Sequence, residues 1–122
     1  MTLKELYEKI DGNYEQAVNV LRVEKLIDKH VRRICESEVV TKLINAGEDL
    51  DPTALFESGH AMKGVCANLG LTTLAQLASQ IAEEYRPGNE RKMSDEEVRD
   101  IIGKIEELYN KTCEAIKEYQ DQ

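Results

Sequence analysis

The chain has 122 residues, with 16 lysines and arginines against 24 aspartates and glutamates, which gives a formal net charge of −8. This acidic balance argues against DNA, RNA or anionic lipid as a partner, because those ligands are bound by clustered basic groups. Hydrophobic residues make up 41%, enough for a single folded domain over residues 1–122, and no run of 18 apolar residues is present to span a membrane.

The N-terminal part predicts two short helices. Apolar residues recur at helical spacing over residues 3–10 and again over 17–21. The turn signal Asp11-Gly12-Asn13 separates the two segments. We expect these short helices, within residues 1–22, to pack on the remainder of the domain.

Two longer helical segments follow in chain order. The first has one apolar face over residues 26–44, with a kink near Glu36-Ser37-Glu38, and we expect Gly47 to close it. Asp51 and Pro52 open the second, because aspartate is a good N-cap and proline suits the first helical position.

The pattern continues as helix to the C-terminus. The helix opened at residue 52 is expected to end near Leu69, with Gly70 in a left-handed conformation. Residues 71–85 form the next helix, which Arg86-Pro87-Gly88-Asn89 breaks. Ser94-Asp95-Glu96-Glu97 is a capping box for the last helix. Four long amphipathic helices with short connections predict an all-α fold, an antiparallel four-helix bundle with the short N-terminal helices added.

The cysteines Cys35, Cys66 and Cys113 are odd in number and contain no CxxC pair. This pattern predicts neither a disulfide framework nor a thiolate zinc site, but small buried apolar residues in reduced form. The N-terminus also lacks the long apolar region of a secretory signal. Together these features predict a cytoplasmic protein.

A gap in the charge pattern is the most informative feature. Between residues 52 and 82, only Glu57, His60 and Lys63 carry charge or can readily do so. At about 100° per residue, the apolar residues of this helix form a stripe that faces the core, and His60 lies on the opposite side of the helix. Gly64 lies beside His60 on this outward face. Because glycine in a helix interior costs about 1 kcal/mol relative to alanine, an outward glycine suggests a partner that approaches His60 closely. The predicted core stripe consists of Leu55, Gly59, Met62, Cys66 and Leu69.

These residues also carry a family resemblance. The segment Gly59-His60-Ala61-Met62-Lys63-Gly64-Val65-Cys66-Ala67-Asn68-Leu69-Gly70 resembles the signature of histidine-containing phosphotransfer (HPt) domains. The family pattern is His-x-x-Lys-Gly with a further glycine ten residues after the histidine, and all of these positions match. Gly59 departs from it, since the family more often has alanine there. The helix plan also fits, so the resemblance covers most of the chain.

The resemblance implies an intermediate in two-component signalling. Such a domain accepts a phosphoryl group from the aspartyl phosphate of a receiver domain, holds it on histidine and passes it to another receiver. The implied partners are a receiver (response regulator) domain and a sensor or hybrid histidine kinase. The chain is then a phosphoryl-group carrier without ATP-dependent kinase activity of its own, and it has no Gly-rich phosphate loop. No cofactor or metal of its own is implied, because Mg²⁺ belongs to the receiver.

The chemistry of the residues agrees with this role. Histidine has an ordinary pKa near 6.5, so neutral imidazole predominates at neutral pH and can act as a nucleophile. We expect His60 to attack phosphorus in line, Lys63 to place positive charge near the phosphoryl oxygens, and Gly64 to leave room for the receiver. Glu57 either holds the second ring nitrogen or is a solvated acid.

A receiver would dock on the face of the helix that carries His60. Phe56 is either a core-edge residue or an interface anchor, and Asn68 either makes a local hydrogen bond or touches the partner. The expected partner-binding residues are Phe56, Glu57, Ala61, Val65, Ala67 and Asn68.

Two other functions compete with phosphotransfer. The chain could be a non-catalytic helical adaptor that binds a partner helix or subunit, with His60 as silent surface. It could also be a metal-binding bundle, but Glu57-x-x-His60 is a single pair without a second one to face it. We expect a monomer.

Overall fold

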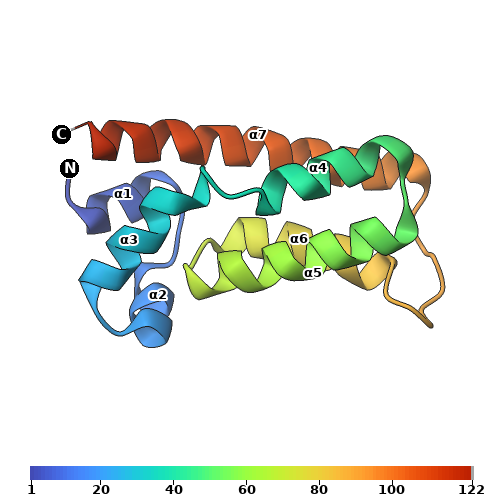
Figure 1. Ribbon diagram of the computed structural model, residues 1–122, viewed down its shortest axis with the longest axis horizontal. Helices are drawn as coiled ribbons and strands as arrows, with labels where there is room; N and C mark the ends of the chain where they lie inside the picture. Colours follow the sequence, from blue (N-terminus) through green and yellow to red (C-terminus); the bar gives the residue numbers. More distant parts are fainter. Residues whose placement is uncertain (122) are drawn as a thin grey trace.

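The structure is a computed structural model that describes residues 1–121, and every regular element in that range is an α-helix (Figure 1). The predicted all-α bundle is therefore confirmed. None of the helices in the described range is both long and apolar enough to cross a membrane. The helices are α1 (Leu3–Lys9), α2 (Tyr14–Leu21), α3 (Glu24–Ile34), α4 (Val39–Asp49), α5 (Pro52–Asn68), α6 (Thr72–Glu84) and α7 (Asp95–Gln120).

The bundle consists of α4, α5, α6 and α7, with α7 along its whole length (Figure 1). The N-terminal helix α1 and helix α3 pack on α7 near its C-terminal end, so the N-terminus and the last turns of α7 lie at the same end of the molecule (Figure 1). The capping box at Ser94 and Glu97 is present, and it starts α7 where the sequence predicts. The hydroxyl of Ser94 accepts a hydrogen bond from the Glu97 N–H, and the Glu97 carboxylate accepts one from the Ser94 N–H.

Helices α5 and α6 form the most extensive packing contact of the fold. Gly59 lies where the two helices approach each other tightly, because a Cβ at this position would lie 3.1 Å from the Ala82 backbone nitrogen and 3.2 Å from the Ala78 carbonyl oxygen. This close packing accounts for a residue without a side chain at this position. The small residues Ala78 and Ala82 on α6 complete the contact.

The single kinked helix expected over residues 26–44 is instead two helices, α3 and α4, separated by residues 35–38. The expectation that Gly47 closes the stretch is also wrong. Gly47 is buried inside α4, where a Cβ would lie 2.6 Å from Cδ1 of Ile102 on α7. The absent side chain lets α4 and α7 approach, and α4 ends only at Leu50, which has a left-handed φ of 52°.

The N-terminal helices are hydrogen-bonded to the C-terminal end of α5. The buried Tyr7 hydroxyl donates a hydrogen bond of 2.5 Å to the carbonyl of Leu69, and the N–H of Asn13 donates one of 2.7 Å to the carbonyl of Gly70. Gly70 has the predicted left-handed conformation, with φ of 70°. A Cβ there would lie 2.1 Å from the Asn13 carbonyl oxygen, so both the dihedral angle and the contact require glycine.

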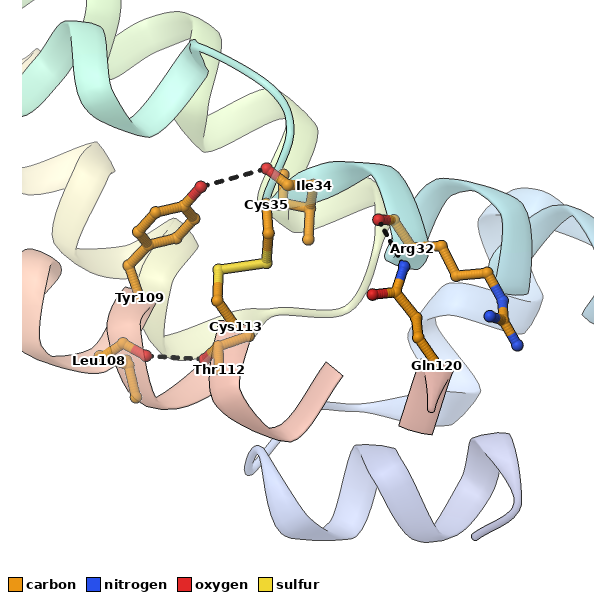
Figure 2. Close-up of a disulfide and its surroundings, with 8 residues drawn as sticks. All are labelled: Arg32, Ile34, Cys35, Leu108, Tyr109, Thr112, Cys113 and Gln120. Carbon is orange, nitrogen blue, oxygen red and sulfur yellow. Dashed lines mark hydrogen bonds between the residues drawn. A yellow bond between two sulfur atoms is a disulfide. The ribbon is translucent and has the colours of Figure 1, made fainter. Parts of the chain in front are cut away.

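The expectation that all three cysteines are reduced is wrong for two of them. Cys35, just after α3, and Cys113, on α7, form a disulfide with a Cα–Cα distance of 5.8 Å and a sequence separation of 78 (Figure 2). Neighbouring contacts join the same two helices, since the Tyr109 hydroxyl donates to the Ile34 carbonyl (Figure 2). Local spacing could not predict a pair that tertiary packing creates. Cys66 is free and buried as expected, and burial raises the pKa of its thiol to about 12.

A buried carboxylate organises the connection between α6 and α7. The Glu84 side chain is 4% exposed and accepts hydrogen bonds from Arg91 Nε at 2.8 Å and from the backbone N–H groups of Lys92 and Met93. Burial alone opposes ionisation, but the hydrogen bonds from Arg91, Met93 and Lys92 outweigh it and lower the pKa of Glu84. The loop is therefore held by one ionised side chain.

Candidate functional site

The site is built on α5, whose two ends are defined by the predicted signals. The Asp51 carboxylate accepts a hydrogen bond from the Thr53 N–H, and Pro52 occupies the first turn. The predicted core stripe is buried along its whole length, so the opposite face of α5 points outward. His60 lies on that outward face and is exposed.

Lys63 and Gly64 lie one turn after His60, on either side of it. Lys63 is half-buried and lines a groove between α5 and α6 together with Gln76 and Ser79. Gly64 is exposed, and a Cβ placed on it would meet nothing within 4 Å. No packing within residues 1–121 therefore explains a glycine here, and the surface beside His60 is open to a partner.

The imidazole of His60 packs on an aromatic ring. Phe56, one turn earlier on α5, stacks against His60 with the ring centroids 5.8 Å apart and an angle of 23° between the planes. Phe56 is half-buried and packs against the core. The guanidinium of Arg86, just after α6, lies with its Cζ 5.4 Å from the Phe56 ring centroid. Phe56 thus combines a core-edge position with direct contact to the candidate nucleophile.

Two charged side chains at the end of α6, Glu83 and Arg86, form an ion pair beside the stacked Phe56 and His60 rings. The Glu83 carboxylate accepts hydrogen bonds from Arg86 Nε at 3.1 Å and from Arg86 Nη2 at 2.7 Å. The hydrogen bond from Arg86 lowers the pKa of Glu83, and the positive charges of Arg86 and Lys63 add to this effect. Glu83 is therefore an ionised group that pairs with Arg86.

The other expected partner-binding residues flank His60 as the sequence predicts, but they do not converge on its ring. Glu57, Ala61 and Asn68 are exposed, and Ala67 is half-buried. Among residues 1–121, Glu57 makes no side-chain hydrogen bond, which favours a solvated acid over a group that holds the imidazole. Asn68 lines a shallow cavity that lies between α3 and α5 and also includes Val65. Their roles in partner binding stay predictions.

Two residues of the site, Glu83 and Arg86, were missed by the sequence analysis. The segment 86–89 was interpreted only as a helix break, because the helical wheel of residues 52–69 shows neighbours on its own helix and nothing beyond. The packing of α5 on α6 brings Arg86 to Phe56, 30 positions apart in the chain. In the described part of the chain, no group of three or more His, Cys, Asp or Glu side chains forms a possible metal position.

Comparison with known families agrees with the geometry. The family model described as "Hpt domain" matches residues 22–118, from the start of α3 to the last turns of α7. The match includes α5 with His60 and the Glu83–Arg86 segment, whereas α1 and α2 lie outside it. No curated protein and no solved structure was found to match the chain. The chain therefore belongs to the Hpt domain family, whose members transfer phosphoryl groups in phosphorelays and interact with receiver domains and kinases.

Proposed function

We propose that this chain is a histidine phosphotransfer protein that carries a phosphoryl group on His60. The donor is the aspartyl phosphate of one receiver domain, and the acceptor is the aspartate of another. The single observation that carries the proposal is an exposed His60 with a half-buried Lys63 and an unobstructed Gly64 beside it, inside the segment matched by the Hpt family model.

The transfer step involves one bond made and one bond broken. The lone pair of a neutral imidazole nitrogen forms the N–P bond, while the P–O bond to the aspartyl carboxylate breaks and its electron pair leaves on the carboxylate. The second ring nitrogen keeps its proton, so charge is conserved. Transfer to the next receiver is the reverse of this step. Lys63 neutralises the negative charge of the phosphoryl oxygens as they pass between the two partners.

The receiver docks on the outward face of α5. Because Gly64 has no side chain, the backbone of a receiver loop can approach the imidazole. The exposed Ala61 and Val65 offer small apolar contacts around it. A sensor or hybrid kinase supplies the phosphoryl group to the relay. We expect the protein to act in the cytoplasm, where its fold must tolerate reduction of the Cys35–Cys113 disulfide.

The first test is incubation with a panel of phosphorylated receivers, followed by mass spectrometry under conditions that preserve acid-labile phosphohistidine. We expect phosphate on His60 alone. His60→Gln should lose phosphoryl acceptance and keep its helical circular dichroism, because the side chain is exposed. His30→Gln is the matched control: His30 is the other histidine of the chain, it is exposed on α3, and its loss should change nothing. If no receiver of a broad panel transferred phosphate, the helical adaptor would be the better hypothesis.

A further inference from the structure

The contact between His60 and Phe56 restricts the ring that is proposed to react. The side chains lie one turn apart on the same face of α5, and the separation of 5.8 Å is within the usual range for stacked aromatic pairs. An exposed histidine without such a contact samples several rotamers. Stacking on Phe56 limits rotation about the side-chain bonds, while the residue as a whole stays exposed to solvent.

Phe56 is in turn held by Arg86. The guanidinium lies against the Phe56 ring, and the two hydrogen bonds that it donates from Nε and Nη2 to the Glu83 carboxylate define the orientation of its plane. The backbone of the same turn is also ordered. Asn89 donates from its side chain to the Glu83 carbonyl at 3.0 Å and from its backbone N–H to the Arg86 carbonyl at 3.0 Å.

The Glu83–Arg86 ion pair has little value as a stabilising element. Both side chains are substantially exposed, at 52% and 39%, and such surface pairs contribute between zero and about 1 kcal/mol to folding. Its position is more informative than its strength, because it joins the end of α6 to the aromatic ring that stacks on His60. Arg86 contacts the Phe56 ring, and the positive charge of Lys63 adds to the effects that lower the pKa of Glu83.

We infer that Arg86 and Phe56 are positioning residues for the phosphorylation of His60, with Glu83 as the anchor of Arg86. Arg86 holds the Phe56 ring, and Phe56 holds the imidazole with its nucleophilic nitrogen directed outward. This inference rests on the proposed function for its effect on rate, whereas its structural part concerns the orientation of the His60 ring alone.

The test separates ring positioning from receiver docking by use of phosphoramidate, a small phosphoryl donor that needs no docking surface. We expect Phe56→Leu and Arg86→Ala to slow phosphorylation of His60 by this donor by roughly three- to tenfold, the range expected for loss of one stacking contact. Arg86→Lys should restore only part of the rate, because lysine keeps the charge but not the planar group. Arg99→Ala, an exposed arginine on α7, is the matched control and should react as the unaltered protein does.

Nuclear magnetic resonance supplies a readout that a merely structural role would not change. In the unaltered protein, the Phe56 ring current should shift the His60 ring protons, and the shift should disappear in Phe56→Leu and shrink in Arg86→Ala. Unchanged His60 ring shifts together with unchanged rates in Arg86→Ala would overturn the inference. If the unaltered protein took no phosphate from phosphoramidate or from any receiver, the proposed function would fail, while the ring shifts would still decide the positioning role.

Discussion

Gly64→Ala is expected to stabilise the protein and impair its function at the same time. Gly64 lies inside α5, is exposed, and has nothing within 4 Å of the position of a Cβ. Alanine should therefore gain the full difference in helix propensity, about 1 kcal/mol, without any steric cost in the free protein. For a chain of this size, that gain corresponds to an increase in the melting temperature of roughly 3–5 °C.

The functional cost should appear only when a receiver docks. If the receiver docks as proposed, a methyl group at Gly64 overpacks the interface, which costs about 1–3 kcal/mol, or roughly five- to 160-fold in the transfer rate. We expect the rate from a phosphorylated receiver to fall by this amount in Gly64→Ala, and further in Gly64→Gln. The rate from phosphoramidate should change by less than about twofold, since this donor is small.

Gly103→Ala is the matched control for this prediction. Gly103 lies inside α7, is exposed, and likewise has nothing within 4 Å of the position of a Cβ. Gly103→Ala should stabilise the protein as Gly64→Ala does, but it should leave the rate of transfer from the receiver unchanged. Melting temperatures and transfer rates of both variants test whether the effect on transfer is specific to Gly64. Receiver transfer at the original rate in Gly64→Gln would refute the close-approach argument.

Three further predictions concern stability. Glu84→Gln should lower the free energy of unfolding at pH 7 by about 1–3 kcal/mol. Because the pKa of Glu84 is lowered in the folded protein, the stabilisation by the carboxylate is lost when it is protonated, so the difference between variant and unaltered protein should shrink as the pH falls below 4.5; urea titrations at several pH values measure this difference. Gly70→Ala should cost about 2–4 kcal/mol in urea unfolding, since alanine conflicts with both the positive φ and the Asn13 carbonyl; a cost near zero would contradict the packing of the N-terminal helices on α5. Reduction of the Cys35–Cys113 disulfide should lower the stability by about 2–4 kcal/mol in calorimetry with and without reductant, whereas a variant with serine at both positions should not respond to reductant.

The helices themselves could be predicted because their signals are local. Asp51 before Pro52, Gly70 after α5, and the capping box at Ser94 each act on backbone groups within one turn, and each is present. The same locality explains why the face of His60 was predicted correctly. The backbone geometry of a helix determines which of its own residues lie opposite its core stripe.

Two errors arose where a residue depends on another helix. Gly47 looks like a helix end by its identity, but in the structure it is a contact point for Ile102 on α7. The count and spacing of cysteines predicted reduced thiols, but the packing of α3 on α7 pairs Cys35 with Cys113. In each case the partner lies on α7, far along the chain.

The sequence by itself determined most helix ends and caps, the outward position of His60 and the resemblance to the family, because all of these depend on neighbours within a few residues. Only the tertiary structure decided that Arg86 lies on Phe56 and that Cys35 pairs with Cys113. The physical reason is that contacts between helices depend on how their side chains interlock, and that packing is a property of pairs of surfaces rather than of any one helix.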